Sequence, residues 1–188
     1  MTLLTQSSRP NGSVALWTVL PDTYTTITFR PHFLFMQVFE LKVPPVALVV
    51  VFAVLMWAAS IVFSTTSFPL PGASIIAFTF AFVGGGIAGA GVFAFRRHET
   101  TVNPMKPETT ATLVTGGIYR FTRNPMYLGI AFILTGWAIY LANLAALLLL
   151  PAFVAYMTRF QIKPEERTLL EKFGSSFADY MAAVRRWI

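Results

Sequence analysis

Two long stretches without a single charged side chain limit what this chain can fold into. They cover residues 43–95 and 126–158. A transmembrane helix needs about 20 predominantly apolar residues, and charge-free runs of this length are rare in water-soluble folds, where helices keep one polar face. The sequence therefore predicts an all-α integral membrane protein. A soluble bundle of fully buried helices is the alternative interpretation.

The first stretch is interrupted near its middle by residues 64–72. This segment contains two prolines and a glycine, which end a helix and favour a turn. The sequence predicts one transmembrane helix near residues 44–63 and a second near residues 73–95. On the second helix, Gly85 and Gly89 form a small-xxx-small pattern, which either lets another helix pack closely or leaves room for a ligand.

The second stretch, residues 126–158, has 33 residues. As one helix it would measure about 50 Å at 1.5 Å per residue, which exceeds the ~30 Å hydrocarbon core of a bilayer. A hairpin is therefore predicted, with helices near residues 126–142 and 144–160. Asn143 is the strongly polar residue between them, and Pro151 is expected to kink the last helix.

The charged residues indicate the topology. All 14 lysines and arginines and all eight acidic residues lie in residues 1–42, 96–125 and 159–188, whereas the connections 64–72 and 141–144 carry no charge. Four helices place the three charged segments on one side, which the positive-inside rule identifies as cytoplasmic. We therefore expect an integral membrane protein with both termini in the cytoplasm. Basic loops beside a membrane account for the net charge of +6, so nucleic acid is not an expected partner.

The predicted organisation consists of a tail and one membrane domain. Residues 1–40 are polar and contain prolines, and we expect them to be loosely ordered. Residues 41–188 are expected to form the membrane domain, with cytoplasmic parts at 96–125 and 161–188. The last part contains Pro164, which suits the first turn of a helix, and its apolar residues recur at helical spacing. It therefore predicts interfacial helices.

Two further features of the last segment bear on its structure. Gly174 is expected to divide it into two short helices. The triplet Arg185-Arg186-Trp187 combines cations with an aromatic ring, which is typical of the headgroup level of a membrane.

The residue inventory restricts the chemistry. The chain has no cysteine and two histidines, which excludes a disulfide scaffold, a cysteine-ligated metal and a cysteine nucleophile. No metal site is expected. The connection 96–125 is rich in Thr, Gly, Asn and Arg, and loops of this length are usually functional or disordered. Within it, Gly116 and Gly117 predict a turn where backbone amides can approach a ligand.

Two sequence motifs carry a resemblance to a known family. The first is Leu113-Val-Thr-Gly-Gly-Ile-Tyr-Arg-Phe-Thr-Arg-Asn-Pro-Met-Tyr-Leu-Gly129, at the entry to a predicted membrane helix. The second is Pro164-Glu-Glu166, followed by Phe173-Gly174 and Tyr180. In this order, on either side of a helical hairpin, they resemble the integral-membrane methyltransferases typified by isoprenylcysteine carboxyl methyltransferase, which are related to phospholipid N-methyltransferases. The resemblance covers residues 40–188 and is strongest over 101–188.

This resemblance implies S-adenosylmethionine as the cofactor and a lipidic acceptor that arrives from the bilayer. The cofactor-binding residues that it implies are Gly116, Gly117, Tyr119, Asn124, Pro125, Tyr127, Glu165 and Glu166. The catalytic residues that it implies are Arg123, Asn124 and Tyr127. Methyl transfer from a sulfonium is an in-line displacement that depends on positioning and on exclusion of water, and it requires no metal.

Two of these assignments have a purely structural alternative. Glu165 and Glu166 also suit the positive end of a helix dipole. Arg123 is expected to face the pocket and to pair with an anion, because an unpartnered charge at the membrane boundary is costly. The candidate anions are the cofactor carboxylate, an acidic acceptor, or Glu165 and Glu166. The alternative is that Arg123 only anchors the chain among lipid headgroups.

The sequence departs from the carboxyl methyltransferases at two positions that bear on the acceptor. Asn124 stands where that family usually has histidine before the motif proline, and Gln161 stands where it often has arginine. A lipidic carboxylate is the expected acceptor, and a phospholipid amine is the alternative. Two other classes remain as alternatives. One is an NADPH-dependent membrane reductase, because sterol reductases share an Asn/His-Pro-x-Tyr motif, and the other is a membrane protein that is not an enzyme.

Overall fold

The computed structural model describes residues 43–97 and 112–188, which belong to the compact unit His32–Ile188. Within the described residues the secondary structure is helical and no β-strand forms. The predicted tail, residues 1–40, and residues 98–111 of the predicted cytoplasmic loop lie outside the described residues.

The described α-helices are α2 (Pro45–Val62), α3 (Ala73–Arg97), α4 (Pro125–Leu141), α5 (Leu144–Leu147), α6 (Leu149–Met157), α7 (Lys163–Phe173) and α8 (Ser175–Ala183). They are joined in part by the 3-10 helices η1 (Ser64–Thr66) and η3 (Gly117–Arg120) and by a π-helical turn, η4 (Thr158–Ile162). Among the described residues, three stretches are long and apolar enough to cross a membrane: Pro45–Val62, Ala73–Arg97 and Leu144–Phe173. Helix α4 is also apolar but is shorter, with 17 residues.

Prolines mark where two of the helices begin. Pro45 and Pro125 each occupy the first turn of their helix, where the missing N–H costs no hydrogen bond. Pro164 lies in the first turn of α7, which follows directly from the π-helical turn η4. Gly174 separates α7 from α8 with a φ of 55°, a left-handed value that glycine adopts without a Cβ clash. The division at Gly174 is the one predicted from the sequence.

The last membrane helix differs from the predicted range, residues 144–160. It is interrupted at Leu148, between α5 and α6, because Pro151 has no N–H to donate to the carbonyl of Leu147. It also does not stop at residue 160, because the turn η4 carries it into α7. The membrane helix and the segment that bears the glutamate pair are therefore one continuous helical stretch.

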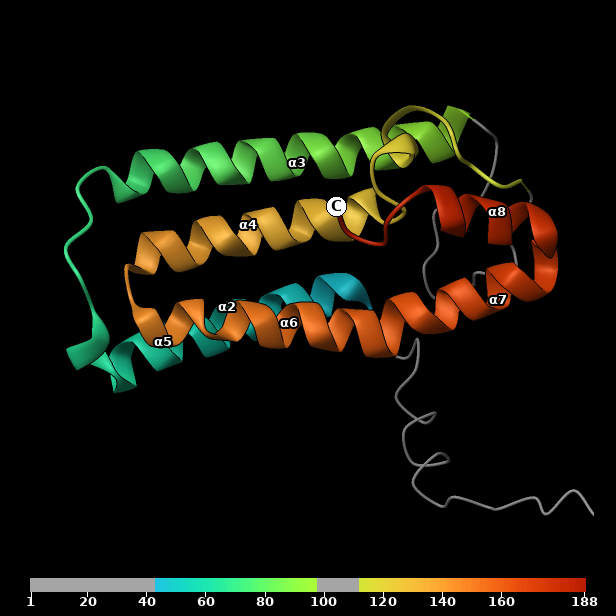
Figure 1. Ribbon diagram of the computed structural model, residues 1–188. Coiled ribbons are helices and arrows are strands. Elements are labelled where there is room, and N and C mark those ends of the chain that lie inside the picture. Colours follow the sequence, from blue (N-terminus) through green and yellow to red (C-terminus); the bar gives the residue numbers. More distant parts are fainter. Residues whose placement is uncertain (1–42, 98–111) are drawn as a thin grey trace, which may run out of the picture. The chain divides into compact units, whose positions relative to one another are not determined.

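Helices α3 and α4 lie side by side (Figure 1), and small residues let their backbones touch. A Cβ on Gly84 would lie 2.5 Å from the carbonyl oxygen of Gly129. A Cβ on Gly136 would lie 2.7 Å from the carbonyl oxygen of Ala77. Any larger residue at these positions would push the two helices apart.

Gly85 and Gly89, the pair predicted to mediate packing, lie on a face of α3 that does not contact α4. No described atom of another element lies within 4 Å of a Cβ built at either position, and both residues are exposed. Successive residues point about 100° apart around a helix, so Gly84 meets α4 while Gly85 turns away from it. The prediction that Gly85 and Gly89 mediate packing is therefore wrong within the described chain.

An apolar core lies between α2, α4, α5, α6 and the turn η4. Its completely buried side chains are Met56, Ala138, Ala146, Phe153, Met157 and Ile162. The rings of Phe52 and Phe153 meet edge to face with their centroids 5.2 Å apart, which is a favoured aromatic geometry. The indole N–H of Trp137 donates to the carbonyl of Ala53 at 3.0 Å and so ties α4 to α2.

Asn143, between α4 and α5, is completely buried. Its Nδ2 donates to the carbonyl of Phe63 at 2.9 Å and to Oγ of Ser67 at 3.0 Å. Its Oδ1 accepts from Oγ1 of Thr66 at 3.1 Å and from the amide of Ala146 at 3.2 Å. An isolated β-bridge also joins Ser67 and Asn143. The polar residue of the hairpin therefore caps α5 and fixes the neighbouring connection between α2 and α3.

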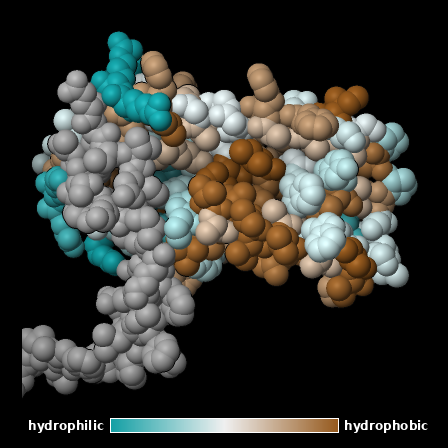
Figure 2. All heavy atoms as spheres, turned by 180° about the vertical axis from the view of Figure 1, so that it is seen from behind, coloured by the Kyte–Doolittle hydropathy of each residue, from teal (hydrophilic) through white to brown (hydrophobic). Residues whose placement is uncertain are grey.

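Large apolar side chains cover the outside of α2 and α3. Exposed examples are Val46, Val54, Trp57 and Ile61 on α2 and Ile75, Phe78, Phe82 and Phe93 on α3. Figure 2 shows apolar surface across the middle of the helices and strongly hydrophilic side chains toward the end where α7 and α8 lie. Exposed apolar area of this extent suits contact with lipid rather than with water.

Candidate functional site

Two segments that are far apart in the sequence meet where α4 and α7 begin. Tyr127, in the first turn of α4, donates a hydrogen bond from its phenolic Oη to Oε1 of Glu165, in the first turn of α7. Tyr127 is buried and Glu165 is partly buried. Pro125 begins α4, whereas α7 continues from the π-helical turn η4. This bond joins the two sequence motifs.

Glu166, the next residue of α7, is held by two arginines. Its Oε1 lies 3.1 Å from Nη2 of Arg123, and its Oε2 lies 2.6 Å from Nη2 of Arg186. Nε of Arg186 also donates to both carboxylate oxygens, at 3.1 and 3.2 Å, so Arg186 binds in the two-point geometry that favours Arg–carboxylate pairs. The side chains of Arg123 and Glu166 are only 11% and 12% exposed. The anion that faces Arg123 is therefore Glu166.

Arg123 and Asn124 also bind the backbone of the segment that follows α7. Nη1 of Arg123 donates to the carbonyl of Met181 at 3.1 Å. Nδ2 of Asn124 donates to the carbonyl of Arg186 at 2.9 Å, and the amide of Asn124 donates to Oγ1 of Thr122 at 3.2 Å. The side chain of Asn124 is thus used to hold another part of the chain.

Gly117 opens the 3-10 helix η3 with a φ of 61°, which explains why glycine stands there. A Cβ at Gly116 or Gly117 would have no described neighbour within 4 Å, so the turn has open space beside it. This turn directly precedes η3, which contains Tyr119. No hydrogen bond or ion pair among the described residues links either glycine to the glutamates.

Tyr119 is buried beside this cluster, with its ring edge to face against Phe95 at 5.4 Å between centroids. Its carbonyl accepts a hydrogen bond from Oη of Tyr180 at 2.7 Å. Burial raises the pKa of Tyr119 well above its ordinary value, and the nearby Tyr180 and Glu165 raise it further. Burial also raises the pKa of Tyr180 to about 12, against the lowering effect of Arg123. Both phenols therefore stay protonated near neutral pH and are poor general bases.

Two buried polar atoms at this site, Oη of Tyr119 and Nε of Arg123, have no hydrogen-bond partner in the described structure. Buried polar groups are nearly always hydrogen-bonded, so these atoms leave capacity for a bound molecule. Tyrosine faces beside a carboxylate suit a cation that also carries hydroxyls. S-adenosylmethionine has a sulfonium, an ammonium and ribose hydroxyls, so the residues present fit the implied cofactor. In the described part of the chain no group of three His, Cys, Asp or Glu side chains is placed to hold a metal ion.

Gln161, the position of the second sequence departure, lies in the π-helical turn and is buried. Its Nε2 donates to the carbonyl of Val43 at 2.6 Å, and its Oε1 has no described partner. Gln161 therefore ties the turn before α7 to the start of α2. The neighbouring Arg159 lies over the ring of Phe160, 5.5 Å from its centroid.

Arg186 belongs to this site, although its sequence pattern did not predict it. Its triplet is typical of a headgroup-level anchor, yet Arg186 turns inward to Glu166, and Nε1 of Trp187 donates to Oγ1 of Thr158 at 3.1 Å. Twenty positions and a glycine break separate Arg186 from Glu166, so no helical spacing predicts the contact. Glu166 was the sequence feature that could have indicated such a partner, because a partly buried carboxylate needs a cation beside it.

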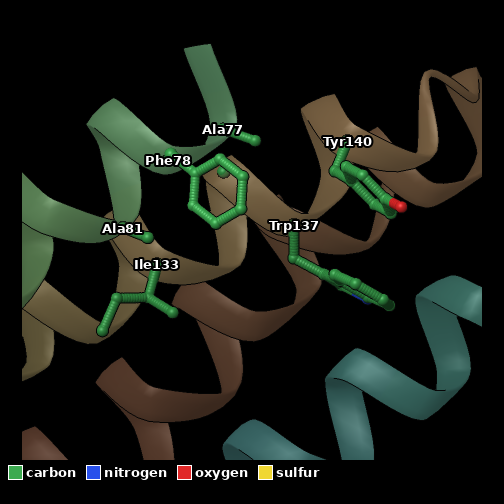
Figure 3. A pocket seen from close by; sticks show the side chains of 7 residues that line it. Ala77, Phe78, Ala81, Ile133, Trp137 and Tyr140 are labelled. Atoms are coloured by element: carbon green, nitrogen blue, oxygen red, sulfur yellow. The ribbon is translucent and has the colours of Figure 1, made fainter. Parts of the chain in front are cut away.

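A separate apolar cavity of about 440 Å³ lies between α3 and α4 (Figure 3). Its lining residues are Ala77, Phe78, Ala81, Ile133, Gly136, Trp137 and Tyr140. The rings of Trp137 and Tyr140 stack with their centroids 5.6 Å apart. The cavity lies toward the end of α4 that is remote from Tyr127, and it shares no lining residue with the polar cluster.

Comparison with known proteins gives the family. The profile of the phospholipid methyltransferase family matches residues 73–176, which is more than half of the chain and contains Tyr127 and both glutamates. An uncharacterized protein of Haemophilus influenzae is 40% identical over 63 residues, which are 34% of this chain and 100% of that relative. No solved structure matches the chain. The resemblance to integral-membrane methyltransferases is therefore confirmed, and the chain belongs to the phospholipid methyltransferase family.

Proposed function

We propose that this protein transfers a methyl group from S-adenosylmethionine to the amino headgroup of a membrane lipid. The observation that carries the proposal is the contact of Tyr127 with Glu165, beside the arginine-bound Glu166. Family membership supports methyltransferase activity at a membrane.

The cofactor supplies an electrophilic methyl group on a positively charged sulfur. The faces of Tyr119 and Tyr127 favour a cation, and Oη of Tyr119 can hydrogen-bond to a bound molecule. The carboxylate of Glu165 can accept hydrogen bonds from an ammonium or from ribose hydroxyls. Gly116 and Gly117 add backbone amides with open space beside them. These groups would bind and orient the cofactor between the two motifs.

The charges of the site favour an amine over the carboxylate that the sequence resemblance suggests. The guanidinium groups of Arg123 and Arg186 are both turned toward Glu166. Glu165 instead bonds to the neutral phenol of Tyr127. A carboxylate in this setting attracts a cationic or hydrogen-donating headgroup and repels an anionic one. Membership of the phospholipid methyltransferase family supports the same choice.

An amine acceptor gives up a proton when it is methylated, so the site needs a base. Glu165 is the group that we propose for this role, and the hydrogen bond from Tyr127 orients its carboxylate. The phenols of Tyr119 and Tyr180 are less suitable because burial raises the pKa of each. The apolar helices around the site would exclude water from the reacting groups.

We also propose four membrane spans in a bacterial inner membrane, with the site on the cytoplasmic side. The 17 residues of α4 measure about 26 Å at 1.5 Å per residue, close to the ~30 Å hydrocarbon core. With α4 as a span, all basic residues fall on one side, in residues 1–42, 96–125 and 159–188. The positive-inside rule then makes that side cytoplasmic.

Binding measurements on the purified protein in lipid nanodiscs test the cofactor. We expect S-adenosylmethionine to bind and NADPH not to bind. Binding of NADPH in its place would favour the membrane reductase. Binding of neither would contradict the proposal and favour a protein that is not an enzyme.

A methyl-label transfer assay tests the acceptor. The two candidates are vesicles that contain phosphatidylethanolamine and a prenylated cysteine with a free carboxylate. We expect label on the lipid nitrogen. Label on the prenylated cysteine alone would contradict the amine and return the acceptor to a carboxylate.

Glu165→Gln and the matched Glu171→Gln separate a site carboxylate from a helix-start charge, because Glu171 is exposed on the same helix. We expect methyl transfer to fall at least about tenfold in Glu165→Gln, the loss of roughly 1.4 kcal/mol, and to stay normal in Glu171→Gln. Equal turnover in the two variants would assign Glu165 to the helix start only.

A further inference from the structure

Residues 184–188, here called the strap, run back from α8 to the start of α4, where the C label lies in Figure 1. Backbone oxygens of the strap accept three hydrogen bonds from the segment before α4. They come from the amide of Arg123 to Arg185 (3.0 Å), from Nδ2 of Asn124 to Arg186 (2.9 Å) and from Oγ1 of Thr122 to Arg186 (3.3 Å). The strap therefore holds three consecutive residues of the first motif.

Side chains of the strap bind the second motif at the same time. The guanidinium of Arg186 binds both oxygens of Glu166, with a closest distance of 2.6 Å. The indole of Trp187 bonds to Thr158, in the turn that precedes α7. The side chain of Arg186 is 32% exposed and that of Glu166 is 12% exposed, so Arg186 closes the outer edge of the site.

We propose that Arg186 is a positioning residue of the methyltransferase site and that the strap sets the spacing between the two motifs. This inference rests on the proposed function, because the spacing matters for a cofactor bound between them. The family profile ends at residue 176, so the strap lies beyond the matched range.

The geometry explains why Arg186 matters more than its partial exposure suggests. Arg123 approaches one oxygen of Glu166, which leaves the carboxylate free to rotate, whereas Arg186 contacts both oxygens and fixes its plane. Glu165 precedes Glu166 in the same helical turn, so a fixed Glu166 also limits the movement of Glu165. Arg186 thereby limits the movement of Glu165 in its contact with Tyr127.

Arg186 also positions Tyr127, the other partner of this contact, through its backbone carbonyl. The carbonyl of Arg186 binds Asn124, which directly precedes α4. Tyr127 stands three positions later, in the first turn of α4. Arg186 thus sets the positions of Tyr127 and of Glu165 from opposite sides, through hydrogen bonds to Glu166 and Asn124.

The experiment measures S-adenosylmethionine affinity by calorimetry, with the full chain in nanodiscs. The variants are Arg186→Gln, Arg186→Lys and the matched control Arg97→Gln, at an exposed arginine that ends α3. We expect about a tenfold loss of affinity in Arg186→Gln, partial recovery in Arg186→Lys because lysine keeps the charge without the two-point contact, and wild-type affinity in the control. In a Glu166→Gln background, Arg186→Gln should add little, because both changes remove one contact.

A second measurement needs no cofactor. Hydrogen exchange of residues 121–124 reports on the amide of Arg123, which is bonded to the carbonyl of Arg185. We expect faster exchange there in Arg186→Gln and unchanged exchange in α3. If Arg186→Gln does not fold, Arg186→Lys is measured in the same way.

Weaker binding together with faster exchange would support the inference. Unchanged affinity in the folded variant would overturn it whatever the exchange shows, since the strap would then be structural only. A wild-type protein that does not bind S-adenosylmethionine would refute the proposed function instead. In that case unchanged exchange in Arg186→Gln would overturn the inference, and faster exchange would support a positioning role for Arg186 in the site of another ligand.

Discussion

Tyr127 and Glu165 are 38 positions apart in the sequence, and the phenol of Tyr127 donates a hydrogen bond to the carboxylate of Glu165. Tyr127 stands in the first turn of α4, which begins at Pro125. Glu165 stands in the first turn of α7, which follows directly from the π-helical turn η4. Both sequence motifs converge on this contact, which makes it the most direct place to test the site.

Tyr127→Phe keeps the buried ring and removes the hydroxyl. We expect the fold to persist and methyl transfer to fall at least about tenfold, roughly 1.4 kcal/mol, because Glu165 loses its orienting partner. The control is Tyr140→Phe, at an exposed tyrosine on the same helix. Wild-type turnover in Tyr127→Phe would show that the ring only fills space.

Arg123→Lys tests the clamp on Glu166. Arg123 reaches Glu166 with Nη2 and the carbonyl of Met181 with Nη1, and a single ammonium cannot reproduce that fork. We expect methyl transfer to drop at least about tenfold, measured beside Arg97→Lys as a control at an exposed arginine. An anchor among headgroups tolerates lysine, so near-normal turnover would give Arg123 that role.

Two neighbouring glycines test the packing of α3. A methyl group on Gly84 would meet the backbone of α4, whereas one on Gly85 would meet no described atom. We expect Gly84→Ala to lower the free energy of unfolding by about 1–3 kcal/mol and Gly85→Ala to leave it unchanged or raise it slightly. Thermal unfolding in detergent measures both. The same unfolding temperature for the two variants would contradict the described packing.

The topology can be tested with single cysteines, because the chain has none of its own. Thr65 lies in the connection between α2 and α3, Ser176 lies in α8, and both are exposed. In whole cells, a membrane-impermeant thiol reagent should label Thr65→Cys, while Ser176→Cys should react only after the membrane is opened. Reversed labelling would invert the topology, and labelling of both from outside would exclude four spans.

The helices were predictable because their signals are local. Charge-free runs mark segments that water does not favour, and Pro45, Pro125 and Gly174 mark helix ends through their own backbone chemistry. The break at Leu148 was harder to place, since it results from the missing N–H of Pro151 one turn later. The continuation of that helix past residue 160 also escaped prediction, because a π-helical turn has no simple sequence signature.

The contacts of the site were predictable only in part. The resemblance indicated the residues of both motifs, but it could not show that Glu166 takes two arginines while Glu165 takes a phenol. Arg186 was not predicted because the same sequence pattern, arginines beside a tryptophan, occurs both at membrane surfaces and inside binding sites. Gly84 and Gly85 are identical in composition, and their roles differ only through the angle at which each leaves the helix.

The π-helical turn has a consequence for the lipid acceptor that we propose. It joins the apolar part of Leu144–Phe173 to the carboxylates as one rod. From Leu149 to Glu165 this stretch rises about 24 Å at 1.5 Å per residue. If it spans the bilayer as we propose, hydrocarbon around its first half would fix the height of Glu165 in the headgroup layer. A lipid acceptor would then be chosen by how far its nitrogen stands above the hydrocarbon, and its tails would be free to vary.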